Sequence, residues 1–166
     1  MKRWRQIMTM CLLLVSYKTV VGAEVYHILR GSVVGVIDGD TVKVLDSTRT
    51  QHRIRLQGID APESKQAYGQ RSKQALSKKI FGKTVSVKWK ERDRYGRIIG
   101  DIYLDNRWIN LELVQEGWAW HYKRYSNDKR LAEAEVKARQ AQRGLWQDAH
   151  PISPWDFRKL KRARNF

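Results

Sequence analysis

The strongest constraint on the fold is an alternation of apolar and polar residues that begins near residue 33 and recurs in short segments. Five segments show it: residues 33–37, 41–45, 52–57, 84–89 and 98–104. Turn sequences such as "DGD", "DSTRT" and "DN" stand between or beside them. Period two is the side-chain period of a strand with one buried face, so the sequence predicts five short β-strands.

The helical periodicity is confined to a few intervals. Residues 64–83 predict a helix with Gly82 at its C-terminal cap, a short helix is expected after Asn110, and a last helix is expected over 128–143, between Asn127 and Gly144. The face of the first helix comprises Tyr68, Ala75, Leu76, Lys79 and Ile80, and the stripe of the last comprises Leu131, Ala134, Ala138, Ala141 and Leu145.

Five strands with a helix inserted between the third and the fourth are typical of an OB-type barrel. This is a five-stranded Greek-key fold that commonly binds oligonucleotides. We therefore predict a β-barrel with about three helices, formed by residues 24–149 and followed by a basic tail over 150–166. The fold alone does not define a function.

The charge indicates a polyanionic partner. The 166 residues carry 33 Lys and Arg against 17 Asp and Glu, a formal charge of +16. Histidine offers no rival chemistry, because His27, His52, His121 and His150 lack the spacing of a zinc site. Trp118, Trp120 and Trp146 are interpreted as packing residues, since tryptophan is mostly buried in folded proteins.

Residues 1–23 have the pattern of an export signal. A basic start precedes an apolar run, and the segment ends in the small residues Gly22 and Ala23. Lys18 interrupts the approach to this end, so a retained N-terminal anchor is the alternative. Cys11, the single cysteine, lies inside this segment, so the exported chain would have no thiol. We expect an exported protein, periplasmic or secreted.

The stretch "RIRLQGIDAPES" places charged residues beside a buried strand. If Ile54 and Leu56 face the core, Arg55 must point away from it, and the same alternation puts Arg97 outside. Asp40 lies in a tight turn in which Gly39 could take a positive φ angle. Any one of these residues alone would be interpreted as a turn residue or part of a solvated ion network.

Together, three motifs carry a resemblance. "DGDTVKV", then "RLQGIDAPE" and later "DRYGR" resemble the signature of the staphylococcal (micrococcal) nuclease family, secreted calcium-dependent phosphodiesterases built on an OB-type barrel. The similarity runs from about residue 33 to 146. A lone "DGDT" would be weak, but the three motifs in this order are specific.

The resemblance implies a set of site residues. Asp40 and Asp60 match the calcium ligands, together with the backbone carbonyl of Ala61. Glu63 matches the general base for the attacking water. Arg55 and Arg97 match the pair that grips the scissile phosphate.

The resemblance also implies substrate contacts. Tyr95 matches a ring and hydroxyl near the nucleotide phosphate, and Arg94 stands where the family commonly has lysine. The family's base-stacking tyrosine falls on Lys123 in an ungapped comparison, so Tyr122 and Tyr125, which flank this position, are both candidates.

The function implied is calcium-dependent, sugar-nonspecific hydrolysis of DNA and RNA that leaves 3′-phosphate ends. We expect a monomer with no obligate protein partner and no stable membrane association after signal cleavage. The alternative from another class is a noncatalytic OB-type nucleic-acid-binding module. A basic membrane-surface protein is a third possibility, for which only a retained N-terminus could supply the amphipathic helix.

The tail "RKLKRARNF" follows Pro151 and Pro154 and has no acidic residue. Two interpretations stay open. It could be a solvated, solubilising end, or it could contact phosphates outside the site and raise affinity through counterion release.

Overall fold

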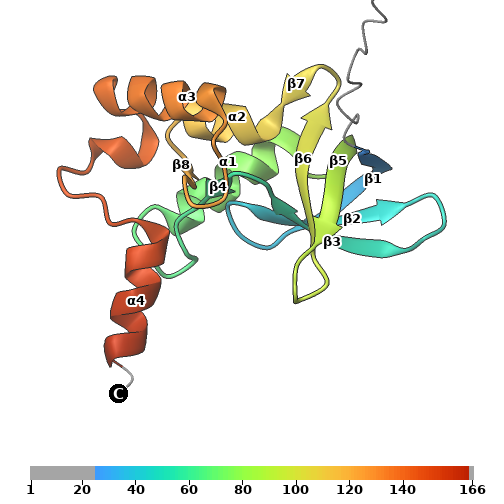
Figure 1. Cartoon of the computed structure of the whole chain (residues 1–166), viewed down its shortest axis with the longest axis horizontal. Coiled ribbons are helices and arrows are strands. Elements are labelled where there is room, and N and C mark those ends of the chain that lie inside the picture. The colour runs from blue at the N-terminus through green and yellow to red at the C-terminus, as the bar shows by residue number, and fades with distance from the viewer. Residues whose placement is uncertain (1–24, 165–166) are drawn as a thin grey trace, which may run out of the picture.

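The computed structural model describes residues 25–164. These residues form a β-barrel and a layer of helices beside it, with the last helix projecting from the helical side (Figure 1). The predicted signal segment, residues 1–23, lies outside the described residues.

The elements follow one another in an order close to the predicted one. The strands are β1 (His27–Val36), β2 (Thr41–Asp46), β3 (Gln51–Leu56), β4 (Ile59–Asp60), β5 (Thr84–Arg92), β6 (Ile98–Leu104), β7 (Arg107–Trp108) and β8 (Trp120–His121). The helices are α1 (Gly69–Ile80), α2 (Ile109–Gln115), α3 (Lys129–Gln140), the 3₁₀ helix η1 (Gly144–Gln147) and α4 (Pro154–Arg164).

The five predicted strands close into a barrel. The order is β3-β2-β1-β5-β6, with antiparallel neighbours, and β3 also pairs with β6 in parallel. The long strand β1 spans the barrel because it pairs with β2 along one part and with β5 along another. The OB-type barrel predicted from the alternation is confirmed.

Side-chain alternation places the core as predicted. Ile54 and Leu56 are fully buried, while Arg55 between them lies outside the core, with 14% of its side chain exposed. The register pairs Arg55 of β3 with Thr41 of β2. The residue next to Thr41 is Asp40, so the barrel itself brings the arginine beside the first motif.

Several local expectations need correction. Gly39 does not adopt a positive φ angle. The N-cap of α3 is Asp128 and not Asn127, because the Asp128 side chain accepts the backbone N–H of Arg130. Ala141 is exposed and does not belong to the buried stripe of the last helix. Gly82 has the positive φ expected of a residue that ends a helix.

The tail differs most from expectation. Residues 25–164 contain four α-helices instead of about three, because residues 154–164 form α4. Pro154 is the first residue of this helix, a position where the missing N–H of proline is harmless. The tail is therefore helical over residues 154–164, while its side chains from Lys159 to Arg164 are exposed, and both interpretations of its role stay predictions. Within the described residues, no helix combines the length and the apolar character needed to cross a membrane.

Candidate active site

The turn between β1 and β2 presents Asp40 from a buried position. The Asp40 side chain accepts the hydroxyl of Thr41 on Oδ1 at 3.0 Å and the backbone N–H of Ala61 on Oδ2 at 2.6 Å. Gly39 is required for space: a Cβ there would lie 1.9 Å from Ser72 Oγ and 2.6 Å from Ala61 Cβ. The turn is thus pressed against α1 and the segment after β4.

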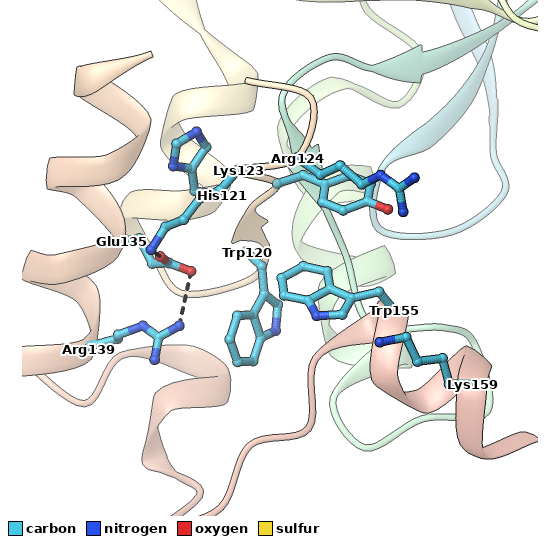
Figure 2. Close-up of a pocket in the computed structure, with 9 residues that line it drawn as sticks. Trp120, His121, Lys123, Arg124, Glu135, Arg139, Trp155 and Lys159 are labelled. Atoms are coloured by element: carbon cyan, nitrogen blue, oxygen red, sulfur yellow. Dashed lines mark hydrogen bonds and ion pairs between the residues drawn. The ribbon is translucent and has the colours of Figure 1, made fainter. Parts of the chain in front are cut away.

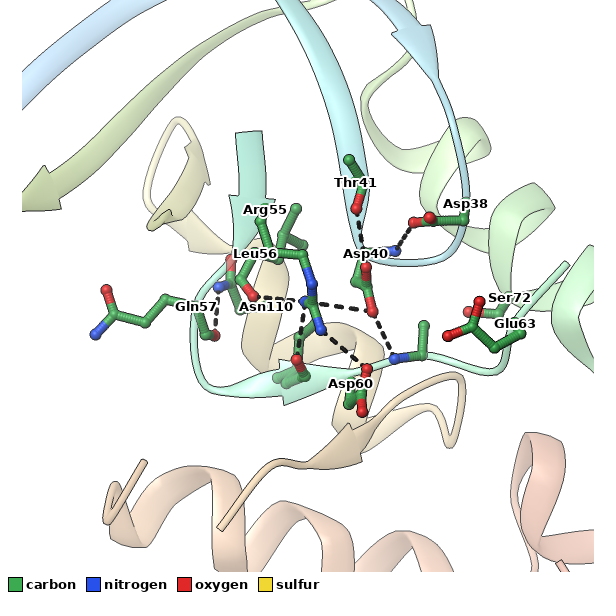
Figure 3. Close-up of polar contacts among 12 residues, drawn as sticks. Asp38, Asp40, Thr41, Arg55, Leu56, Gln57, Asp60, Glu63, Ser72 and Asn110 are labelled. Carbon is green, nitrogen blue, oxygen red and sulfur yellow. Dashed lines mark hydrogen bonds and ion pairs between the residues drawn. The ribbon is translucent and has the colours of Figure 1, made fainter. Parts of the chain in front are cut away.

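Arg55 joins the two aspartates of the predicted metal site (Figure 3). Its Nη2 donates to Asp60 Oδ1 at 2.9 Å, and its Nη1 lies 3.3 Å from Asp40 Oδ2. Nη1 also donates to the carbonyls of Leu56 and Ile59, both at 2.9 Å. Within residues 25–164 no partner contacts Arg55 Nε, so this edge of the guanidinium can meet a ligand.

Burial makes the carboxylates of this site electrostatically costly. Burial raises the pKa of Asp60, against the opposing hydrogen bond from Arg158 and the charge of Arg55. Burial and the neighbouring charge of Asp40 together raise the pKa of Asp38 to about 6. A cluster of carboxylates that repel one another in a desolvated place attracts a cation, and the arginines supply part of that charge.

Glu63 lies at the rim of the cluster, on the loop after β4. Its side chain is 41% exposed, and its Oε1 accepts a hydrogen bond from Arg158 Nη1 at 2.8 Å. Arg158 also donates from Nη2 to Asp60 Oδ2 at 2.7 Å and from Nη1 to Asp60 Oδ1 at 3.3 Å. An arginine of the C-terminal helix thus bridges the second metal-ligand candidate and the candidate base.

The arginine of the third motif lies apart from this cluster. Arg97 donates from Nε to Asp93 Oδ2 at 2.7 Å, across the turn that joins β5 and β6. Tyr95 in that turn is 65% exposed, and its hydroxyl accepts a hydrogen bond from Arg94 Nη2 at 2.6 Å. In the described part of the chain, Arg97 makes no contact with Arg55 or the clustered carboxylates, so its predicted pairing with Arg55 stays a prediction.

The two candidate base-stacking residues, Tyr122 and Tyr125, contact each other, and Tyr122 also contacts α4. The rings of Tyr122 and Tyr125 meet edge to face at 4.8 Å, and Tyr122 stacks on Trp155 of α4 with centroids 5.3 Å apart and planes 1° from parallel. Tyr125 is 65% exposed, while Tyr122 is half-buried. Tyr125 therefore has the freer face for a base.

Beside these rings lies a cavity of about 320 Å³ (Figure 2). It lies between the β8 region, α3 and α4, and it is lined by aromatic and basic side chains, among them Trp120, Arg139, Trp155 and Lys159. Trp120 and Trp146 are buried and pack edge to face, so the packing role predicted for them is confirmed.

The donor set suits a hard divalent cation, but its oxygens are turned to arginines. Asp40, Asp60 and Glu63 offer carboxylates, the ligands that calcium prefers, and the carbonyl of Ala61 lies next to Asp60 in the chain. Within residues 25–164, no three acidic, histidine or cysteine side chains converge closely enough to hold a metal ion. The chemistry of the residues fits the cation, and loading it would require them to rearrange.

The closed OB-type barrel, with paired aspartates, an arginine between them and a glutamate at the rim, places the protein in the class of OB-type barrels, a fold that commonly binds oligonucleotides. The staphylococcal nuclease homologue model matches residues 53–148. The chain belongs to the staphylococcal nuclease family.

Relatives from bacteria share most of the chain. It is 48% identical over 134 residues to an uncharacterized endonuclease of Escherichia coli. This alignment covers 80% of this chain and 87% of the relative. It is 40% identical over 158 residues to a micrococcal nuclease of Shigella flexneri, with 88% and 90% covered. It is 38% identical to the protein ParB of Escherichia coli over 156 residues, with 87% and 88% covered.

Asp38, in the "DGD" turn, accepts the backbone N–H of Asp40 on its Oδ1 at 3.1 Å, which is the role of a turn residue. Sequence reasoning missed one participant of the site, Arg158. Its position in the sequence predicts only a place in the basic tail, and no motif marks it. The only available signal was the Ser153-Pro154-Trp155-Asp156 start, which resembles a capped helix.

Proposed function

We propose that this protein is an exported, calcium-dependent, sugar-nonspecific nuclease that hydrolyses phosphodiester bonds of DNA and RNA and leaves 3′-phosphate ends. The observation that carries the proposal is the cluster in which Arg55 joins Asp40 and Asp60 while Glu63 stands at its solvent edge. The names of two relatives, an endonuclease and a micrococcal nuclease, support the same activity.

The chain's own residues supply three parts of the chemistry. The free edge of Arg55 can donate to a phosphate oxygen, and a planar guanidinium suits this because it forms parallel hydrogen bonds. Glu63 reaches solvent, so its carboxylate can orient a water and accept its proton. Arg97 lies on a hairpin turn, and bound substrate would draw it from Asp93 to a second phosphate oxygen.

Calcium would be held by Asp40, Asp60 and the carbonyl of Ala61. A bound divalent cation would supply positive charge that offsets the negative charge growing on the phosphate during attack. Arg55 keeps the two aspartates beside one another, and its contacts with two backbone carbonyls hold it in place.

Substrate binding rests on the charge and rings around the cluster. The formal charge of +16 favours polynucleotides over small neutral ligands. Tyr125, Tyr95 and Arg94 are exposed and can contact bases or phosphates. We expect the protein to act as a monomer in the periplasm or outside the cell, delivered there by the segment 1–23.

A substrate-gel assay tests the proposal. DNA or RNA is cast in the gel, and the protein is incubated with calcium, with magnesium, with zinc or with chelator. The proposal predicts cleavage with calcium that chelator abolishes and zinc does not restore, since the donor set is all oxygen. Full activity in excess chelator would contradict metal dependence, and binding without cleavage in every condition would favour the noncatalytic OB-type module.

A further inference from the structure

Helix α4 delivers Arg158 to the centre of the candidate site from the far end of the chain. The guanidinium bridges Asp60 and Glu63, with contacts of 2.7 Å to Asp60 Oδ2 and 2.8 Å to Glu63 Oε1. The hydrogen bonds to both carboxylates raise the pKa of Arg158 although burial opposes this, so the group is fully charged. The contact is a strong charge-assisted bridge.

The helix is seated by several contacts that aim this arginine. Ser153 Oγ donates to Asp156 Oδ2 at 2.6 Å and accepts the Asp156 backbone N–H at 3.2 Å, which caps the helix start. Trp155 stacks on Tyr122 and meets Trp120 edge to face at 5.5 Å. The position of Arg158 therefore follows from the docking of the whole helix.

The bridge engages the same oxygens that a cation would need. Calcium takes oxygen ligands at about 2.3–2.6 Å, and a guanidinium on the same oxygens would oppose it as a like charge. Asp60 Oδ1 is already held by Arg55, and Arg158 takes Oδ2. While both arginines are in place, each carboxylate oxygen of Asp60 is paired with a guanidinium group.

We propose that Arg158 is a built-in competitor of the divalent cation, and that α4 must lift this side chain from Asp60 and Glu63 before the site can be loaded. The inference rests on the proposed function, since it assumes that these carboxylates bind the metal. The docked helix is then an inhibitory arm that also withholds the candidate base, because Glu63 Oε1 is engaged by the same guanidinium.

Apart from its docked first turn and the bridge, little holds the arm in place. Arg158 is 37% exposed against 14% for Arg55, and Pro154 is the only buried residue of α4. Because few buried contacts hold the rest of the helix, a cation on the carboxylates would have to compete mainly with the bridge itself. Beyond Arg158 the described part of the helix carries Lys159, Lys161, Arg162 and Arg164 and no acid, so polyanionic substrate would favour the lifted arm.

Calcium titration by calorimetry, without nucleic acid, tests the competition. Arg158→Ala should bind calcium about tenfold or more tightly than the parent, because a competing closed state that is ~90% populated weakens the apparent affinity by that factor. Arg162→Ala is the matched control, since this arginine lies one turn further along the helix and has no ion pair among residues 25–164. Its calcium affinity should equal that of the parent.

The outcomes separate this inference from the proposed function. An Arg158→Ala variant with the parent's affinity, or an equal gain in Arg162→Ala, would overturn the competition while leaving a calcium enzyme. Parent and Arg158→Ala that both fail to bind calcium would overturn the proposed metal requirement itself.

Hydrogen exchange on the unmodified protein gives a second readout that needs no variant. Calcium should accelerate exchange of the amides of residues 154–164 and leave those of β2 and β3 unchanged. Unchanged exchange in α4 at saturating calcium would contradict the lifting of the arm.

Discussion

Asp60 is held by two arginines that come from very different parts of the molecule. Arg55 belongs to β3, where strand pairing fixes its place and two backbone carbonyls accept its Nη1. Arg158 belongs to a helix of which one end is docked and most residues are exposed. The comparison teaches that one carboxylate can have a permanent partner, supplied by the barrel, and an exchangeable one, supplied by the arm.

The largest effect on stability is expected from a change at Arg55, the arginine held by the barrel. Arg55→Ala leaves the buried carboxylates of Asp40 and Asp60 without their shared partner, and breaking a buried ion pair costs roughly 3–5 kcal/mol. We expect a loss of this order in the free energy of unfolding, measured by denaturant titration. Arg97→Ala is the control, because Arg97 pairs at a partly exposed turn and its loss should cost about 1 kcal/mol or less. Equal losses in both variants would contradict a structural role peculiar to Arg55.

Glu63 should affect turnover and not the fold. Glu63→Gln keeps the shape of the side chain but cannot accept a proton, so turnover should fall by roughly 10²–10⁴-fold. The free energy of unfolding and the Kd for DNA should change little. Single-turnover cleavage of a short oligonucleotide measures turnover. Denaturant titration measures the free energy of unfolding, and fluorescence anisotropy measures the Kd for DNA. A variant that cuts at the parent's rate would show that Glu63 is only an ion-pair partner.

The barrel also contains a half-buried carboxyl, that of Asp101 on β6, which contacts neither Arg55 nor Arg158. Burial raises the pKa of Asp101 to about 6, although its Oδ1 accepts hydrogen bonds from Trp108 and Asn110. The folded state therefore holds this proton more tightly than the unfolded state, so its contribution to stability falls as the pH rises from about 4 to above 6.

Asp101→Asn should remove this pH dependence. Between pH 4 and pH 7.5 the parent should lose stability relative to the variant. The unfolding free energy of the variant minus that of the parent should therefore rise by on the order of 1–3 kcal/mol over this range. Denaturant titration at the two values measures it. A difference that does not change with pH would contradict the raised pKa.

The smallest effect is expected on the arm. Trp155→Ala removes the stacking on Tyr122, and an aromatic pair contributes roughly 0.5–1.5 kcal/mol beyond its buried area. The global unfolding free energy should fall by little, while hydrogen exchange in α4 should rise strongly, because the helix loses its main anchor. Phe81→Ala, at an exposed position, is the control. Unchanged exchange in α4 would show that Trp155 does not anchor the arm.

The barrel side was predictable from the sequence for a physical reason. Side chains of a strand point alternately to its two faces. The alternation of apolar and polar residues therefore predicts, correctly, that Ile54 and Leu56 face the core and that Arg55 points away from it. The turn before β2 was recognised, although Gly39 is there for space and not for a positive φ. Local pattern thus predicts elements whose partners are neighbouring strands.

The arm was not predictable by the same reasoning. Its helix has few apolar residues, follows Pro151 and begins at Pro154, which is the pattern of a solvated end. Arg158 and Asp60 are 98 residues apart in the sequence. No pattern in the residues around either one predicts that their side chains are in contact. The direction in which α4 leaves the domain depends on how Trp155 packs on Tyr122, a tertiary contact that period and spacing do not report.

A crystal structure of the protein with calcium and a non-hydrolysable oligonucleotide tests the central claim most directly. The account predicts calcium bound to Asp40 and Asp60, with Arg55 still paired to Asp60 and Arg158 moved away from both Asp60 and Glu63. Calcium bound at these aspartates while Arg158 keeps its contacts would contradict the exchangeable arm. Calcium bound elsewhere, with the phosphate away from Arg55, would contradict the active site itself.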